Sequence, residues 1–229
     1  MTYENSEIEK LLSRLDRNIE ILEVGSGFGL KTQFLKSLGF TNVLGVEKNV
    51  ELVKKARQGG DNVLTLDEFE NSIGDKKFDV LFLSHIVEHF QYENLKEFLE
   101  YYFGFVKDSG YVLIATPVFN NCFYDDFDHV KPYSHVGILS VFGSGDSQVQ
   151  FYSDYQLELI DIRFIKLAYQ IRFYRTLVMR GQFYRIPRII NQLLHLVYRV
   201  SFRLIGRPVS WVGLFEKTTR VDETAQSSQ

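Results

Sequence analysis

The sequence predicts an α/β protein built around a mostly parallel sheet. Two observations lead to this fold class. Five short apolar segments alternate with segments of helical periodicity, which is the pattern of βαβ units and of a parallel sheet buried on both faces. The chain has 229 residues, of which 45% are hydrophobic and 15% aromatic, so it can bury the sizeable core of one domain.

Local patterns predict the individual elements in chain order. Apolar residues at helical spacing predict a first amphipathic helix over 5–17. Further helices are expected from the glycine-rich segment to Gly39, over 49–58 and over 92–106. The seven strands are expected at residues 19–24, 42–47, 62–66, 78–83, 111–116, 157–168 and 211–217.

A glycine-rich motif, E-x-G-x-G-x-G, joins the first strand to the next helix and consists of Glu23, Gly25, Gly27 and Gly29. Glycine allows the backbone to turn tightly and to approach a ligand closely. A dinucleotide fingerprint and a P-loop each need a glycine at the position that Leu30 occupies, although the following Lys-Thr pair would fit a P-loop. The motif therefore favours a ligand other than a dinucleotide or a nucleoside triphosphate.

Two acids and a fourth-strand motif follow this glycine loop. Glu47 ends the second expected strand, Asp67 ends the third, and FDVLFLSHIVEHF (78–90) contains the fourth. With the glycine loop, the two acids and the fourth-strand motif in this order, the chain resembles the class I S-adenosylmethionine-dependent methyltransferases. The resemblance is to the ubiquinone-biosynthesis-like proteins and the type 11 or 23 domains in particular, and it covers roughly residues 19–166 and 210–217. The resemblance implies a Rossmann-like three-layer sandwich with a seven-stranded, mostly parallel sheet and an antiparallel last strand.

The resemblance also implies S-adenosylmethionine as the cofactor, bound at the carboxyl ends of the strands. In the family, acids at the positions of Glu47 and Asp67 accept hydrogen bonds from the ribose hydroxyls and the adenine amine, a role that suits carboxylates. Ser84 would lie beside the sulfonium. The implied cofactor-binding residues are Glu23, Gly25, Gly27, Gly29, Glu47, Asp67 and Ser84.

The segment SHIVEH (84–89) has several interpretations. His85, Glu88 and His89 have the H-x-x-E-H spacing of a zinc-binding motif, but that motif belongs inside a longer helix, whereas here it follows a buried strand. In ubiquinone-biosynthesis and small-RNA 2′-O-methyltransferases, which this segment resembles, E-x-x-E-H and a later histidine surround a divalent ion. The chain matches at Glu88 and His89 and departs from the pattern at His85.

The later histidine of such a metal site would be His129 or His135. The expected metal ligands are His85, Glu88, His89 and His129. A histidine in place of the first glutamate would favour a softer ion than magnesium. Alternatively, His89 makes only a structural hydrogen bond and Glu88 faces solvent, or the site removes a proton without a metal. The catalytic candidates are His89, His129 and Tyr133, and Lys131 could position the acceptor.

A basic segment lies between the last two expected strands. Residues 1–161 carry 14 Lys or Arg and 26 Asp or Glu, a net charge of −12, whereas residues 162–215 carry ten basic residues and no acid. Pro187 and Gly206 bracket an amphipathic helix with arginines on its polar face. This helix could pack on the core or on a second subunit in a homodimer. It could also contact a membrane peripherally through 185–207, or bind nucleic acid or a phosphate-bearing acceptor.

The sequence thus predicts one methyltransferase domain over 1–229, with a helical insertion at about 170–208 and a disordered tail at 219–229. The expected reaction is O-methylation of a hydroxyl on a sugar, a glycolipid or a small metabolite. The alternatives are an RNA 2′-O-methyltransferase and a non-catalytic cofactor-binding module. A single cysteine, a polar N-terminus and the lack of an apolar run of ~18 residues lead us to expect a cytoplasmic protein, in which the insertion can place the enzyme at a membrane.

Overall fold

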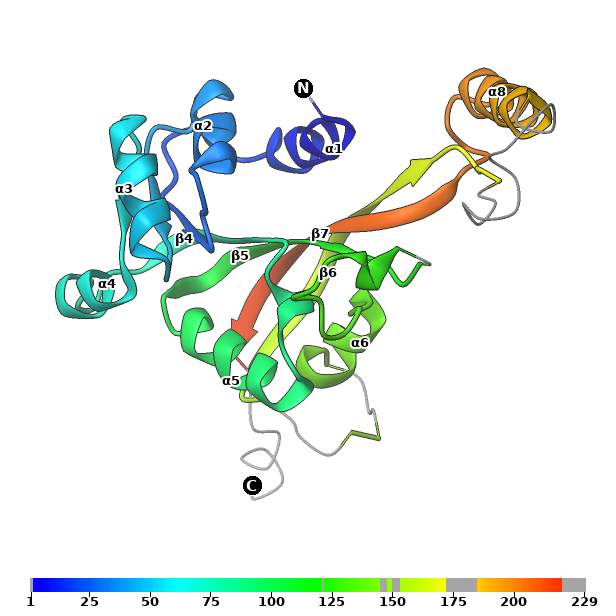
Figure 1. Ribbon diagram of the computed structural model, residues 1–229. Helices are drawn as coiled ribbons and strands as arrows, with labels where there is room; N and C mark the ends of the chain where they lie inside the picture. Colours follow the sequence, from blue (N-terminus) through cyan, green and yellow to red (C-terminus); the bar gives the residue numbers. More distant parts are fainter. Residues whose placement is uncertain (1, 121, 145–147, 150–152, 172–184, 220–229) are drawn as a thin grey trace.

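The fold is a three-layer α/β sandwich around one seven-stranded sheet (Figure 1). The computed structural model describes residues 2–120, 122–144, 148–149, 153–171 and 185–219. The strands are β1 (Ile21–Val24), β2 (Val43–Val46), β3 (Val63–Leu64), β4 (Phe78–Ser84), β5 (Val106–Pro117), β6 (Tyr155–Leu167) and β7 (Arg207–Thr219).

The strand order is β3-β2-β1-β4-β5-β7-β6. All neighbours pair in parallel except β7, which runs antiparallel to both β5 and β6. The predicted fold class, including the antiparallel last strand, is therefore confirmed. The order reverses between β1 and β4, and ligands of open α/β sheets bind at the carboxyl ends of the strands beside such a reversal.

Helices cover both faces of the sheet. They are α1 (Tyr3–Leu12), α2 (Leu30–Ser37), α3 (Val50–Gln58), α4 (Leu66–Ser72), α5 (Tyr92–Phe103), α6 (His135–Phe142) and α8 (Arg185–Val200), with 3₁₀ turns η1 (Val87–His89) and η2 (Phe123–Asp125). Among the described residues, no helix is both long enough and apolar enough to cross a bilayer. The first helix ends at Leu12, five residues earlier than expected, and α4 and α6 were not predicted.

The alternating side chains of the strands form two cores, one on each face of the sheet. On β4, Val80 and Phe82 pack with α1 and α2, whereas Leu81 and Leu83 pack with α5 and α6. All four of these side chains are fully buried. A strand covered on both sides must be apolar at every position, which explains why these strands appear as continuous apolar segments in the sequence.

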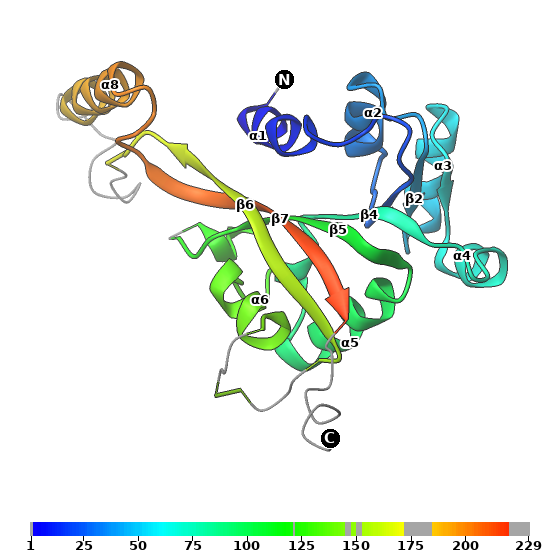
Figure 2. The ribbon, with the colours of Figure 1, turned by 180° about the vertical axis from the view of Figure 1, so that it is seen from behind.

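The predicted insertion between the last two strands is present as a projecting arm. The strands β6 and β7 continue as a ribbon away from the sheet, and α8 lies at its end, apart from the other helices (Figures 1 and 2). Residues 172–184 of the insertion and 220–229 of the expected disordered tail lie outside the described residues.

Candidate active site

The glycine loop lies at the carboxyl end of β1, where the sequence placed it. Gly25, Gly27 and Gly29 all have positive φ angles, of 74°, 55° and 79°. A Cβ atom on Gly25 would lie 2.0 Å from Ile86 Cδ1, so a side chain there would clash with the segment after β4. A Cβ on Gly27 would meet nothing within 4 Å. The loop therefore presents open space in its middle, which fits close approach of a ligand to the backbone.

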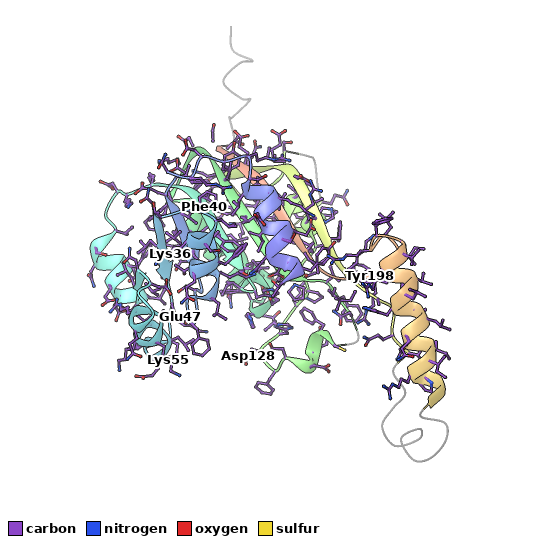
Figure 3. The ribbon with its side chains drawn as sticks, turned by 90° about the horizontal axis from the view of Figure 1, so that it is seen from above. Lys36, Phe40, Glu47, Lys55, Asp128 and Tyr198 are labelled. Carbon is purple, nitrogen blue, oxygen red and sulfur yellow. The ribbon has the colours of Figure 1, made fainter. Side chains whose placement is uncertain are left out.

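Glu47 follows β2 and is only 7% exposed. Its carboxylate accepts hydrogen bonds from the backbone N–H of Gly27 (3.0 Å) and of Asn49 (2.8 Å). The predicted ribose-binding acid thus lies directly against the glycine loop. In Figure 3, Glu47 lies among the elements that carry the cofactor loop, well away from α8.

The prediction that Asp67 ends the third strand is wrong. The strand β3 ends at Leu64, and Thr65 then caps α4 in a capping box with Glu68. Asp67 is therefore the second residue of α4, and its side chain is exposed. The capping box ends the strand early because it satisfies the first free N–H groups of the helix. Its signature, Thr-x-x-Glu, is visible in the sequence.

Glu23 lies near the carboxyl end of the central strand β1 and is buried, with 1% of its surface exposed. It accepts a 2.5 Å hydrogen bond from the hydroxyl of Thr32 on α2. Burial raises the pKa of Glu23 to about 7, although the hydrogen bond from Thr32 and the charge of Lys31 oppose that rise. Glu23 therefore joins β1 to α2, the helix that follows the glycine loop.

Serine hydroxyls mark the edge where the cofactor is expected. Ser84 is the last residue of β4 and Ser26 lies in the glycine loop. Both Oγ atoms are buried and, among the described residues, have no hydrogen-bond partner. A polar ligand at this edge would satisfy them, because buried hydroxyls are normally hydrogen-bonded. These atoms and the open space at Gly27 are consistent with a bound S-adenosylmethionine.

His85 adopts a left-handed backbone conformation, with φ at 56°. Its Nε2 lies 2.9 Å from Glu4 Oε2, and its Nδ1 lies 3.2 Å from Glu88 Oε1. Burial alone would lower the pKa of His85, but the hydrogen bonds and charges of the two carboxylates outweigh it and raise the pKa to about 10. Because both ring nitrogens face carboxylates, His85 stands outside the group that can bind a metal.

Three of the predicted ligands come together after β4. The ligand atoms of Glu88, His89 and His129 all lie within 4.8 Å of one another. His135 is elsewhere, with its ring against Phe164 and Trp211. Two imidazoles and one carboxylate form a donor set that suits zinc, iron or manganese more than magnesium. Ligand atoms about 2.1 Å from a cation lie about 3.0–3.4 Å apart, so small side-chain rotations would complete such a site.

The backbone orients both imidazoles of this group. His89 Nδ1 lies 3.0 Å from the carbonyl oxygen of Asp128, and His129 Nδ1 lies 2.6 Å from that of Phe123. A carbonyl oxygen can only accept, so each Nδ1 carries a proton. With Nδ1 as the donor, Nε2 is the ring atom that can take a proton or a cation. Nε2 of His129 lies 3.7 Å from Asp126 Oδ2 and 4.0 Å from Glu88 Oε1.

Glu88 is fully buried and is held in place by the end of β5. The hydroxyl of Thr116 donates to Glu88 Oε2 at 3.0 Å. The backbone carbonyl of Glu88 accepts from the N–H groups of Val130 (2.8 Å) and Lys131 (3.1 Å). These bonds fix the loop that carries His129 against the turn that carries His89.

A cavity of about 460 Å³ lies beyond this loop, between the start of α5 and α6. Tyr133 lines it, and the hydroxyl of Tyr133 donates to the carbonyl oxygen of Phe90 at 3.0 Å. The amine of Lys131 lies over the rings of Tyr92 and Tyr133, at 5.4 and 5.1 Å from their centroids. Tyr133 is therefore a wall of this cavity and is not part of the histidine group.

Sequence reasoning missed two residues at this edge. Thr116 is the penultimate residue of β5 and follows Ala115, the partner of Ser84, so the rule that strand ends meet at one edge could have identified it. Glu4 lies on α1, where nothing in the local pattern distinguishes it from the other polar residues. It reaches the site because α1 packs across the edge and places Glu4 2.7 Å from Lys31 and 2.9 Å from His85.

Comparison with known proteins identifies the family. The profile of a family described as "Methyltransferase domain" matches residues 3–195. The ubiquinone biosynthesis O-methyltransferase of Dictyostelium discoideum is 29% identical over 114 residues, which are 43% of this chain and 35% of that protein. The match thus spans about a third of that relative's length.

Solved structures show the same fold at low sequence identity. A SAM-dependent methyltransferase from Archaeoglobus fulgidus superimposes with a TM-score of 0.57 at 21% identity, covering 93% of this chain and 92% of the other. A Burkholderia thailandensis N-methyltransferase with bound S-adenosylhomocysteine gives a TM-score of 0.53 at 12% identity, covering 93% and 76%. Together with the family match, these findings show that the chain belongs to the methyltransferase domain family and has the class I fold of S-adenosylmethionine-dependent methyltransferases.

Proposed function

We propose that this enzyme methylates a hydroxyl oxygen of a small acceptor, in the class of sugars, glycolipids and small metabolites. The observation that carries the proposal is the pair of imidazoles, His89 and His129, whose Nδ1 atoms face backbone carbonyls and which lie together beside the buried Glu88. The group follows Ser84 at the carboxyl edge of the sheet. The curated relative from Dictyostelium is named an O-methyltransferase, which agrees with an oxygen acceptor.

A hydroxyl is a poor nucleophile until its proton is removed. S-adenosylmethionine supplies the electrophilic methyl group when it is bound. The protein must then orient the acceptor oxygen and take up its proton. A neutral imidazole is the side chain best matched to that task near neutral pH. In this proposal Nε2 of His129 or His89 receives the proton, and Glu88 favours the imidazolium ion that results.

We also propose that the same three side chains can hold a divalent cation. Such a cation would lower the pKa of an acceptor hydroxyl and so assist the same methyl transfer. The carbonyl partners of both Nδ1 atoms support this proposal, because ligating histidines commonly donate their other N–H to a carbonyl or carboxylate. His85 would compete with the cation for Glu88 Oε1, which lies 3.2 Å from His85 Nδ1.

The cavity beside Tyr133 is the candidate acceptor pocket. Its volume is within the range typical of small-molecule sites. The chain from His129 to Tyr133 connects the histidine group to this cavity, and we propose that the acceptor lies there with its hydroxyl directed toward that group. Lys131 at the cavity can bind an acidic group of the acceptor.

Formation of S-adenosylhomocysteine should be measured with a panel of sugars, glycolipids, hydroxylated metabolites, quinols and RNA oligonucleotides. We expect turnover with at least one hydroxyl acceptor. His129→Asn should lower kcat about 100-fold or more, because general-base catalysis contributes that much. His135→Asn is the matched control, since that ring packs on Trp211 outside the group, and it should retain activity.

Chelation separates the two roles of the histidine group. Loss of activity on prolonged dialysis against a chelator, restored by zinc or manganese, would assign a cation to the site. Activity that survives with no metal detected would assign proton removal to the imidazoles alone. Turnover only with amine or thiol acceptors, unaffected by His89→Asn and His129→Asn, would contradict hydroxyl methylation. Activity confined to the RNA oligonucleotides would identify the enzyme as an RNA 2′-O-methyltransferase instead.

A further inference from the structure

The helix α8 stands apart from the rest of the molecule on the β6–β7 ribbon. The pairing of β5 with β7 ends at Pro117 and Ser210, while β6 and β7 remain paired up to Leu167 and Arg207. The two views in Figures 1 and 2 show α8 at the far end of this ribbon. Because β7 is antiparallel, its start lies at the carboxyl edge of the parallel strands, which is the edge that carries Ser84 and the histidine group.

One face of α8 attaches the helix to the ribbon. Tyr198 is 8% exposed, and its hydroxyl donates to the carbonyl oxygen of Lys166 at 2.6 Å. The side chain of Asn191 accepts from Ile171 N at 2.8 Å and donates to Ile171 O at 3.2 Å. In Figure 3, Tyr198 lies between α8 and the body of the protein. The helix is therefore held in a defined orientation on the ribbon.

A second face of α8 is apolar and exposed. At about 100° per residue, five aliphatic side chains fall within a sector of about 100° on the helix surface. Their exposed fractions are 55% for Ile189, 57% for Leu193, 55% for Leu196, 46% for Val197 and 68% for Val200. The apolar surface continues after the helix in Phe202, Leu204 and Ile205, which are 89%, 74% and 55% exposed. Exposed apolar surface of this extent is typical of a binding site.

The third face of α8, beside this apolar sector, is basic. It presents Arg188, Gln192, His195 and Arg199, all exposed. Neither Arg188 nor Arg199 has an acidic partner among the described residues, and residues 162–215 contain no acid at all. A helix with a wide apolar sector flanked by arginines has the distribution of one that lies in the plane of a membrane surface, where long basic side chains extend to lipid phosphates.

We propose that α8 binds the surface of an anionic phospholipid bilayer, with its apolar sector inserted between the headgroups and Arg188 and Arg199 on the phosphates. Charge decides between this partner and a second copy of the chain. Two α8 helices packed about a two-fold axis would bring their arginines together with no acid nearby, which is repulsive. Anionic lipid neutralises the same charges. Binding in this way would place the edge that carries the histidine group toward the bilayer.

The test measures partition of the full-length protein onto vesicles of phosphatidylcholine alone and with about 30 mol% phosphatidylglycerol. We expect binding to the anionic vesicles that weakens as salt rises, because exposed charges are screened beyond ~8 Å at physiological ionic strength. Arg188→Gln with Arg199→Gln should weaken binding about 30-fold, at about 1 kcal/mol per charge. Leu193→Gln with Leu196→Gln should weaken it about 100-fold, because two apolar side chains no longer leave water.

A matched control removes two positive charges from the body of the protein. Lys54→Gln with Lys76→Gln alters side chains that are 61% and 46% exposed, far in sequence from α8, and should leave vesicle binding unchanged. All variants should keep the wild-type melting temperature and cofactor affinity. The proposal is overturned if the wild type ignores anionic vesicles, or if both α8 variants bind them like the wild type. Light scattering that shows a dimer dissociated by the leucine changes, without vesicle binding, would assign the surface to a second copy.

Discussion

The carboxylate of Glu47 has two roles. It accepts the N–H of Gly27 and so helps to set the open conformation of the glycine loop, and it presents negative charge at the edge where the ribose hydroxyls are expected. Glu88 also has two roles. Its backbone carbonyl anchors the loop of His129, and its side chain faces the two imidazoles. Single residues at this edge therefore affect both the shape and the chemistry of the site.

Glu47→Gln should weaken S-adenosylmethionine binding by roughly 10- to 150-fold. The change removes one charge-assisted hydrogen bond, worth about 1.5–3 kcal/mol, while keeping the size of the side chain. Titration calorimetry measures the effect. Glu51→Gln is the control, because Glu51 is exposed, lies four residues after Glu47 and forms an ion pair with the exposed Lys54. Equal affinity of the Glu47 variant and the wild type would show that the ribose lies elsewhere.

Glu23 should make the stability of the cofactor-free protein depend on pH. Its pKa is about 7 in the fold against an ordinary value of 4.5, so the folded state binds more protons between these values. The free energy of unfolding should therefore fall by about 3 kcal/mol as pH rises from 4.5 to 7 and stay level above that. Glu23→Gln should abolish this fall and be the more stable protein at pH 8. Denaturant unfolding at pH 5 and pH 8 tests this, with the exposed Glu97→Gln as a control that should follow the wild type.

Strand ends were the predictable part of the site. Glu23, Glu47 and Ser84 could be placed from sequence because each directly follows a run of buried residues whose periodicity is unambiguous. Asp67 was misplaced because the hydrogen bonds of Thr65 and Glu68 start a helix two residues after the apolar pair of β3. The contact of Glu4 with His85 joins residues 81 positions apart, and no local pattern encodes such a contact.

At the scale of elements, α1 acts as a cover for the cofactor edge. Its apolar side packs into the core through Ile8, Leu11 and Leu12, all fully buried. Its first turn carries Glu4, which joins Lys31 after the glycine loop to His85 after β4. The amphipathic pattern predicted this helix, but the helix α4 was missed because seven residues are too few for a clear period, and α6 because it is apolar on most of its surface.

Glu4→Gln should loosen α1 without unfolding the sheet. Burial alone would raise the pKa of Glu4, but hydrogen bonds and charges from His85 and Lys31 lower it to about 2, so its stabilisation is complete above pH 4.5 and is lost as pH falls toward 2. At pH 7 the variant should lose about 1.5–3 kcal/mol of stability, the worth of charge-assisted hydrogen bonds. Hydrogen exchange should speed up in α1 while β4 and β5 stay protected. Glu9→Gln, the same change on the same helix, should leave exchange as in the wild type.

The whole molecule divides into an acidic body and a basic arm. Residues 1–161 have a net charge of −12, and residues 162–215 one of +10. The body contains strands β1 to β5, the cofactor loop and the histidine group. Tyr198 of α8 binds Lys166 within the arm, and after α8 the guanidinium of Arg203 contacts the body, 4.4 Å from the ring centroid of Tyr3. The strand β7 belongs to both parts, since its residues 210–216 pair with β5 and Trp211 and Phe215 are fully buried.

This division predicts that the arm can be removed without loss of the fold. Leu167 and Arg207 are opposite each other in the ribbon, so Asn-Gly in place of residues 168–206 would connect them with a two-residue hairpin turn. The shortened protein should keep its helical and strand content and bind S-adenosylmethionine within about twofold of the full chain, because every implied cofactor residue lies in the body. It should also lose binding to anionic vesicles.

Trp211→Ala in the full chain is the contrasting control, expected to cost about 3–5 kcal/mol of stability because it opens a cavity in the core. Circular dichroism and calorimetry compare the three proteins. A shortened chain that aggregates or fails to bind the cofactor would show that α8 is an integral part of the folded body.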